Sequence, residues 1–153
     1  MKIEIFEEGN FEDLYRLFYE TIHSVNAKDY RKDQLDTWAP EKIGTEKWKR
    51  RIQNYFVVIA KDEDKIIGFG ELSPEGCIEM LYVHKNYLSQ KVGQKLLESL
   101  IKKAKTIHLS RVVTESSITA KPFFEKQGFE ILKKQVKTFN NVDFLNYKMK
   151  KRI

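Results

Sequence analysis

The pattern of hydrophobic and polar positions predicts a chain whose first third is mostly helical and whose remainder is mostly strand. Between Phe11 and Val25, apolar residues recur at helical spacing, which predicts one amphipathic helix with Asn10 suited to cap it. From Tyr55 the pattern changes, because Tyr55–Ala60 is a continuous apolar run that indicates a strand. A second strong helical pattern covers Val92–Lys105.

The order of these elements predicts a single domain with a mixed sheet and helices on its faces. Asn140 and Asn141 are suited to a tight hairpin turn, Lys61–Lys65 is predicted to be a charged turn, and Gly128 is suited to a helix end that needs positive φ. The predicted strands are Lys2–Phe6, Tyr55–Ala60, Ile66–Leu72, Gly76–Val83, Arg111–Glu115, Ile131–Phe139 and Val142–Met149. The predicted helices are Phe11–Val25, Lys32–Thr37, Thr45–Gln53, Val92–Lys105 and Thr119–Gln127.

Composition supports one folded domain over residues 1–153. Hydrophobic residues make up 41% of the sequence, too large a share for a disordered chain. Cys77 is the single cysteine, so we expect no internal disulfide, and we expect no metal. The acidic N-terminal stretch does not resemble a signal peptide, and no segment has the length and apolarity of a membrane span. We therefore expect a cytoplasmic protein.

The net charge of +6 favours encounters with anions, such as nucleic acid, a membrane surface or a phosphorylated cofactor. The basic residues are scattered in short clusters, and no cluster interleaves with a recognised nucleic-acid motif. We interpret them as solvated surface charge and expect no nucleic-acid or membrane partner. A nucleic-acid-binding domain stays open as an alternative that charge alone suggests.

The loop Leu88–Gly93, which follows a predicted strand and opens a predicted helix, and the segment Ala120–Phe129 resemble parts of the GNAT superfamily of N-acetyltransferases. In that family a central strand leads into a loop of the form Q/R-x-x-G-x-G/A that opens a helix. Here the strand Gly76–Val83 is followed by Leu88-Ser89-Gln90-Lys91-Val92-Gly93 and then a helix. Ala120–Phe129 is similar to the family's A-x-x-x-Y-x-x-x-G-F ending. Further segments similar to a bacterial branch of the family extend the resemblance over nearly the whole chain; these are Phe18–Tyr30, Trp38–Pro40 and Thr114–Ala120.

The resemblance implies one acyl-CoA N-acyltransferase-like domain with an α/β (α+β) fold: a mixed, mostly antiparallel, twisted sheet of about six to seven strands with helices on both faces. It implies direct transfer of an acetyl group from acetyl-CoA to a primary amine of a small molecule or peptide in a ternary complex. It places the N-terminal helices on the acceptor side, with His23, Asn26, Tyr30 and Trp38 as candidates to line the acceptor pocket. The terminal hairpin is suited to pair across a homodimer.

Acetyl-CoA carries a pyrophosphate, and free backbone N–H groups at a helix N-terminus bind such an anion. The strand–loop–helix around Gly93 supplies such groups. The resemblance implies that backbone N–H groups around Leu81–Val83 polarise the thioester carbonyl. The residues expected at acetyl-CoA are Leu81, Tyr82, Val83, Leu88, Ser89, Gln90, Lys91, Val92, Gly93, Gln94, Ser117 and Phe124.

The chain departs from the family pattern at Leu88 (usually Gln or Arg), Lys91 (Gly), Ser117 (Asn) and Phe124 (Tyr). A lysine at position 91 is modestly strained if that position needs positive φ, and its ammonium can pair with the anion. Phe124 has no proton to give to the leaving thiolate, which then takes one from another group, from water or from the ammonium product. These departures keep open an alternative, a catalytically degraded CoA-binding or regulatory module.

Glu79 is the preferred general base, with Glu71 on the preceding strand as its rival. Glu79 lies two residues before Leu81, so both side chains are expected on one face of the strand. Its apolar neighbours are expected to desolvate the carboxylate and raise its pKa. Cys77 is interpreted as a structural cysteine rather than an acyl-carrying nucleophile.

Overall fold

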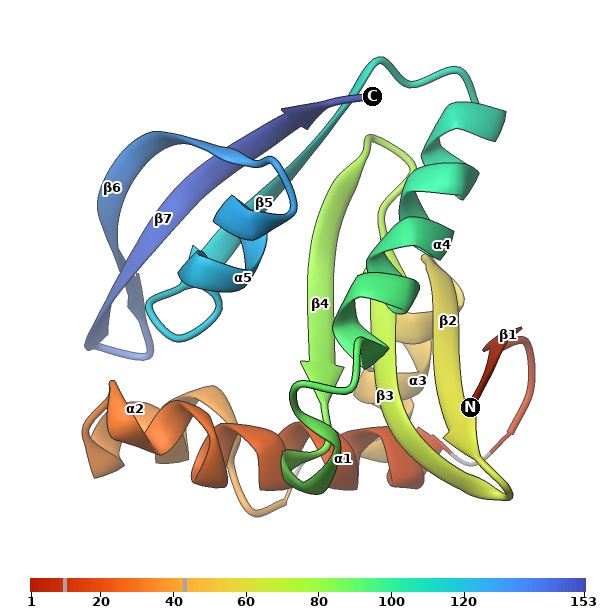
Figure 1. Ribbon diagram of the computed structural model, residues 1–153. Helices are drawn as coiled ribbons and strands as arrows, with labels where there is room; N and C mark the ends of the chain where they lie inside the picture. The colour runs from red at the N-terminus through yellow and green to blue at the C-terminus, as the bar shows by residue number, and fades with distance from the viewer. Residues whose placement is uncertain (10, 43) are drawn as a thin grey trace.

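The computed structural model describes residues 1–9, 11–42 and 44–153, so the cap predicted at Asn10 lies outside the described residues. The strands are β1 (Lys2–Ile5), β2 (Phe56–Asp62), β3 (Lys65–Leu72), β4 (Cys77–Val83), β5 (Arg111–Ser117), β6 (Glu130–Phe139) and β7 (Val142–Arg152). The helices are α1 (Phe11–Ser24), α2 (Lys32–Trp38), α3 (Thr45–Gln53), α4 (Val92–Thr106) and α5 (Lys121–Lys126), with short 3₁₀ turns η1 (Asn26–Lys28) and η2 (Lys85–Tyr87). The predicted order of helices and strands is confirmed (Figure 1).

Within the described residues, the strands form one seven-stranded sheet in the order β1-β2-β3-β4-β5-β7-β6. Neighbouring strands are antiparallel except β4 and β5, which are parallel. Helix α4 covers one face of β2–β4, while α1 and α3 lie on the other (Figure 1). The predicted mixed, mostly antiparallel sheet with helices on both faces is therefore confirmed.

The charged turn predicted at Lys61–Lys65 is shorter than expected. Strand β2 continues to Asp62 and β3 begins at Lys65, because these two residues pair at the end of the ladder. Glu63 turns the chain with a left-handed φ of 53°. The charges that suggested a turn thus lie partly on exposed strand ends, where side chains point into solvent.

The other predicted turn positions are confirmed. Asn140 and Asn141 have φ of 49° and 64°, the two positive values that a two-residue type I′ hairpin turn requires. Gly128, after α5, has φ of 88°. Asparagine tolerates this region better than most side chains, and glycine adopts it without strain.

Strand β2 sends alternate side chains into two hydrophobic cores, one on each face of the sheet. Val57 and Ile59 pack into the core beneath α1 and α3. Val58 and Ala60 pack into the core beneath α4. A strand buried on both faces reads as a continuous apolar run, which accounts for the pattern at residues 55–60.

The sheet divides between β4 and β5. These strands pair only at Cys77–Val113 and Ile78–Thr114, and the Thr114 hydroxyl donates to the Ile78 carbonyl at 3.0 Å. Beyond this point the two strands diverge toward α1 and α2, which run across the open end (Figure 1). Each strand keeps its outer partner, β3 for β4 and β7 for β5, so the divergence does not disrupt the rest of the sheet.

Polar contacts hold the N-terminal helices against the far half of the sheet. Gln34 of α2 donates its side-chain amide to the Asp143 carbonyl at 2.8 Å. The Tyr30 hydroxyl donates to the Leu145 carbonyl at 3.2 Å and accepts from the Ile118 N–H at 2.9 Å. These bonds join segments about a hundred residues apart and close the open end of the divergence.

The close packing of α4 on β3 predicts the effect of Gly68→Ala. An added Cβ would lie 3.0 Å from Leu96 Cδ1 and 3.1 Å from the Tyr82 carbonyl oxygen, which cannot move without disturbing β4. We expect a loss of about 1–3 kcal/mol in the free energy of unfolding, measured by urea denaturation. Gly44→Ala is the matched control, because a Cβ there meets no atom within 4 Å of the described structure. Equal stability of the two variants would contradict this account of the packing.

Candidate functional site

A cavity of about 390 Å³ lies between β4, the N-terminus of α4 and the β5–α5 connection. Gln90 is not among the described residues that line it; its side chain is exposed and donates to the Asn86 carbonyl at 3.4 Å. The other residues expected at acetyl-CoA all line this cavity, which we call the cofactor cavity: Leu81, Tyr82, Val83, Leu88, Ser89, Lys91, Val92, Gly93, Gln94, Ser117 and Phe124.

The loop before α4 has an unusual backbone. Ser89 and Lys91 have φ of 65° and 63°, so position 91 does require the left-handed conformation that a glycine adopts without strain. Position 93 favours glycine for a steric reason, because a Cβ there would lie 3.2 Å from Cε1 of the Phe123 ring on α5. The glycine thus permits close packing between α4 and α5.

The start of α4 is suited to an anion. The first hydrogen bond of the helix runs from the Lys95 N–H to the Lys91 carbonyl. The N–H groups of Val92, Gly93 and Gln94 therefore have no acceptor in the helix, and all three residues line the cofactor cavity. Together with the Lys91 side chain, these groups can hold a phosphate or pyrophosphate.

A second cavity of about 460 Å³, which we call the acceptor cavity, lies between the end of α2, β4, β5 and the tip of the β6–β7 hairpin. It meets the cofactor cavity where β4 and β5 diverge. The residues common to the two cavities are Trp38, Ile78, Glu79, Tyr82, Glu115 and Ser117. A group bound in one cavity therefore reaches a group bound in the other at this junction.

Glu79 lies at the junction because β4 carries a bulge. Leu72 pairs with Ile78 and Glu71 with Met80, which leaves Glu79 as an extra residue on β4. A bulge interrupts the alternation of side chains. The shared face predicted for Glu79 and Leu81 is therefore wrong: Leu81 packs into the core beneath α4, whereas Glu79 approaches Arg51 of α3.

Arg51 lies between the two candidate bases. Its Nε is 3.5 Å from Glu71 Oε1, and a terminal nitrogen is 4.0 Å from Glu79 Oε2. The Glu79 side chain is 35% exposed and lines both cavities, whereas Glu71 is fully buried and lines neither. Glu79 is thus the carboxylate that a bound molecule can contact.

The desolvated carboxylate is Glu71. Burial raises the pKa of Glu71 to about 7, although the Arg51 guanidinium lowers it, and the neighbouring charge of Glu79 adds to the increase. Neither Glu71 oxygen has a hydrogen-bond partner among the described residues. The desolvation expected for Glu79 therefore acts on its neighbour, because Glu71 points from β3 beneath α3 while Glu79 faces the cavities.

Two other groups that line the acceptor cavity stay protonated at neutral pH. Burial raises the pKa of the Cys77 thiol to about 12, and the carboxylate of Glu79 contributes to the increase. This agrees with the interpretation of Cys77 as a structural residue, because a neutral thiol is a poor nucleophile. Burial also raises the pKa of the Tyr82 phenol.

The residues predicted on the acceptor side occupy different positions. Tyr30 lines the acceptor cavity, Trp38 lines both cavities, and Asn26 lines the cofactor cavity. His23 lies outside both linings within the described chain. Of the four predicted residues, Tyr30 and Trp38 therefore line the acceptor cavity, and Asn26 and His23 do not.

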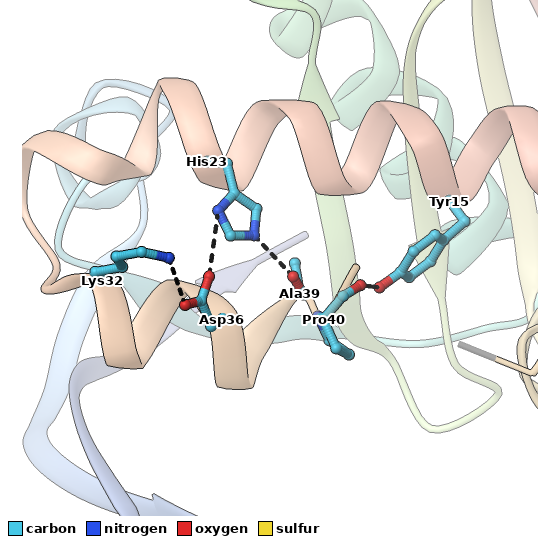
Figure 2. A network of polar contacts seen from close by, with 6 residues as sticks. All are labelled: Tyr15, His23, Lys32, Asp36, Ala39 and Pro40. Carbon is cyan, nitrogen blue, oxygen red and sulfur yellow. Dashed lines mark hydrogen bonds and ion pairs between the residues drawn. The ribbon is translucent and has the colours of Figure 1, made fainter. Parts of the chain in front are cut away.

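Figure 2 shows what His23 does instead. Its Nε2 donates to the Ala39 carbonyl at 2.7 Å, and its Nδ1 is 3.9 Å from Asp36 of α2. On the same side of α1, the Tyr15 hydroxyl donates to the Pro40 carbonyl. His23 thus fastens the end of α2 to α1, and through that contact it fixes the backbone next to Trp38.

Several residues of the site have no signal in the sequence. Arg51 lies on a basic helix among other basic residues, and nothing in that pattern distinguishes it. Lys137, Phe139 and Phe144 reach the acceptor cavity only because the β6–β7 hairpin bends toward α2. Glu115, the last residue of the predicted strand Arg111–Glu115, becomes a junction residue because β5 diverges from β4 there.

No group of three or more His, Cys, Asp or Glu side chains in the described ranges is arranged to hold a metal ion. None of the described helices has the length and apolarity needed to cross a membrane.

Comparisons with known proteins agree with the geometry. A family model described as an acetyltransferase (GNAT) domain matches residues 26–151. The chain is 30% identical over 150 residues to the uncharacterized N-acetyltransferase YafP of Escherichia coli (strain K12), covering 98% of this chain and 95% of that protein.

Solved structures share the fold. A GCN5-related N-acetyltransferase from Rhodopseudomonas palustris has a TM-score of 0.95 and 25% identity, covering 99% of this chain and 95% of its own. The PaiA N-acetyltransferase of Thermoplasma acidophilum, solved in complex with coenzyme A, has a TM-score of 0.78 and 22% identity over 100% of both chains. The likeness to the Thermoplasma acidophilum protein, at 22% identity, shows the fold alone.

The buried carboxylate of Glu71 predicts an unusual dependence of stability on pH. Its pKa is raised in the folded state, so the folded chain binds more protons than the unfolded chain between about pH 4.5 and pH 7. The contribution of Glu71 to stability is therefore present at low pH and is lost as the pH rises through about 7.

Glu71→Gln removes this titration. We expect the stability of the variant relative to wild type to increase by roughly 1–3 kcal/mol between about pH 5 and pH 8, measured by urea denaturation at both values. Glu75→Gln, at an exposed turn position, is the control. Its stability relative to wild type should be the same at both pH values. A relative stability of Glu71→Gln that does not vary with pH would refute the raised pKa.

Proposed function

The chain belongs to the GNAT family of acetyltransferases, and we propose that it transfers the acetyl group of acetyl-CoA to the primary amine of a small molecule or peptide by direct attack in a ternary complex. The family and the predicted acyltransferase class are confirmed. The observation that carries the proposal is the junction of two cavities at Glu79, because transfer without a covalent enzyme intermediate needs both substrates in contact.

Acetyl-CoA fits the cofactor cavity through the start of α4. Its pyrophosphate accepts hydrogen bonds from the N–H groups of Val92, Gly93 and Gln94, and the Lys91 ammonium pairs with the same charge. The left-handed backbone at Lys91 costs about 1 kcal/mol relative to glycine. The added cation offsets this cost when the anion is bound. The coenzyme A complex of the Thermoplasma relative supports a coenzyme A site in this fold.

In the chemical step, the amine nitrogen attacks the carbonyl carbon of the thioester while Glu79 accepts a proton from the nitrogen. Backbone N–H groups of Leu81–Val83 polarise the carbonyl oxygen. The carbon–sulfur bond then breaks, which leaves the amide and a thiolate, and the thiolate takes a proton from water. Phe124 lines the cofactor cavity but offers no proton.

Arg51 and Glu71 support this role of Glu79. The guanidinium contacts both carboxylates, so it restrains the position of Glu79 from the α3 side. Glu71 stays the rival base, with a pKa of about 7 that suits proton transfer near neutral pH. Its complete burial argues that it acts behind Glu79 rather than on the amine itself.

The remaining expectations stay predictions. A catalytically degraded CoA-binding or regulatory module would bind acetyl-CoA without releasing thiol to any amine. A homodimer has mixed support on β6, where exposed apolar side chains such as Val136 share the strand with lysines that oppose pairing of two copies. The cytoplasmic location and the absence of nucleic-acid and membrane partners are likewise predictions from sequence.

Lys91→Gln tests the cofactor site. We expect the Kd for acetyl-CoA to rise by about three- to fivefold, with a weaker dependence on salt, because one exposed cation is removed from the anion. Calorimetric titration measures both quantities. Lys95→Gln, one turn along α4 and outside the described cavity lining, is the control and should bind as wild type does.

Gly93→Trp, which fills the start of the helix, should abolish binding. The cofactor proposal fails if wild type does not bind acetyl-CoA at high micromolar ligand.

Glu79→Gln tests the base. We expect kcat/KM to fall by about 10²–10⁴-fold at neutral pH, because the amine then deprotonates without a positioned base. Thiol release with an accepted amine, followed across pH, measures the loss. Glu75→Gln on the exposed turn before β4 should keep full activity. Full turnover by Glu79→Gln at all pH values would remove the assignment, and a comparable loss in Glu71→Gln alone would transfer it to the rival.

A further inference from the structure

The acceptor cavity has two distinct ends. Its inner end is the junction with the cofactor cavity, where Glu79 and Glu115 lie. Its outer wall, which lines the acceptor cavity alone, comes from Tyr30 and the β6–β7 hairpin, together with Cys77 of β4. If the amine of an acceptor reaches Glu79, as the proposed function requires, the rest of that molecule must lie against the outer wall.

The polar side chains that the hairpin contributes to this wall, Lys137, Thr138 and Asn146, already have protein partners. Each therefore has reduced capacity to bind hydroxyl or ammonium groups of a ligand. The contacts are Lys137 Nζ to Glu115 Oε1 at 3.2 Å, Thr138 Oγ1 to Asp143 Oδ1 at 2.6 Å, and Asn146 Oδ1 to Gln135 Nε2 at 2.9 Å.

Aromatic and apolar side chains provide the remaining contact surface of the outer wall. Tyr30 packs against Trp38 at 5.3 Å between ring centroids, and Phe144 lies 6.3 Å from both rings. The Tyr30 hydroxyl is already bonded to two backbone groups, so its ring is the part left for a ligand. Phe139, near the tip of the hairpin, is 52% exposed and lines the same cavity.

Covering the exposed ring of Phe139 would remove apolar surface from water, which favours a ligand with an apolar group at this wall. The cavity volume of about 460 Å³ is ample for a ring and a short chain. From this wall, and on the basis of the proposed function, we infer that the acceptor is a primary amine carried on an aromatic or bulky apolar group. The ammonium points to Glu79, and the apolar body packs on Tyr30, Phe139 and Phe144.

The same wall disfavours two other classes of amine. A hydroxyl-rich amino sugar would exchange its hydrogen bonds with water for contact with rings, which costs free energy for each unpaired group. A long polyamine would bring further ammonium groups next to the Lys137 ammonium, and Glu115, the carboxylate beside it, is already paired with Lys137. The wall therefore favours apolar area and disfavours additional cations.

The test compares primary amines that differ in the group that carries the nitrogen. Phenethylamine and cyclohexylmethylamine represent the inferred class, while ethanolamine, spermidine and kanamycin represent the disfavoured ones. Thiol release with saturating acetyl-CoA gives kcat/KM for each amine. Calorimetric titration of each amine into the protein saturated with coenzyme A gives its Kd without turnover. We expect kcat/KM to be at least about tenfold higher, and the Kd at least about tenfold lower, for the apolar amines than for the polar ones.

Two variants connect that preference to the wall. Phe139→Ala should raise the Kd and KM for phenethylamine by about three- to tenfold and leave ethanolamine unchanged, because only the apolar body contacts the ring. Phe139 is exposed, so its loss should not disturb folding. Val136→Ala is the matched control: Val136 lies on the same strand, is 60% exposed and is absent from the described cavity lining, so both amines should behave as with wild type.

The outcomes separate the inference from the proposed function. Selective binding of phenethylamine that Phe139→Ala weakens, with no thiol release from any amine, would support the apolar wall and refute the transferase. Equal or tighter binding and turnover of kanamycin, spermidine or ethanolamine would overturn the inference and keep the transferase. Failure of every amine to bind at millimolar concentration would overturn the inference, as would a preference that Phe139→Ala leaves intact.

Discussion

Parallel pairing between β4 and β5 ends after the pairs Cys77–Val113 and Ile78–Thr114, and the whole site depends on this early end. Two neighbouring strands normally satisfy each other's backbone groups along their length, so divergence leaves unpaired N–H and C=O groups on the inner edges. Here the outer pairings of β4 with β3 and of β5 with β7 keep both strands in place while the inner edges part. The cofactor and acceptor cavities are the two halves of the space so formed.

The N-terminal helices and the terminal hairpin keep that space from collapsing. Tyr30 and Gln34 bond to backbone carbonyls of β7, and His23 fastens the end of α2 to α1. Because these bonds join the first and last parts of the chain, the acceptor cavity exists only in the folded whole. Its walls combine an acidic inner end with an apolar outer one, a division that suits a molecule with a cationic head and an apolar body.

Burial, as well as sequence, determines which carboxylate near the junction is protonated and which is accessible to a ligand. Arg51 contacts two carboxylates, yet one is fully buried and the other faces both cavities, so their chemistry differs. Glu71 binds protons near neutral pH because desolvation outweighs its attraction to Arg51. Glu79 stays accessible because a bulge adds one residue to β4 and turns the side chain away from the core. The pair therefore offers an accessible carboxylate backed by a buried one.

The sequence by itself determined the order of helices and strands, the Asn140-Asn141 hairpin turn and the family, because periodicity, turn chemistry and local motifs depend on neighbours in the chain. It also indicated the loop at Lys91–Gly93, although it did not distinguish the left-handed backbone of one from the packing requirement of the other. Only the tertiary structure decided that Glu79 is the bulge residue, that Arg51 joins it to Glu71, and that the hairpin brings Phe139 and Phe144 against Trp38. Those facts depend on strand register and on contacts between residues far apart in sequence, where a shift of one residue changes which side chains meet.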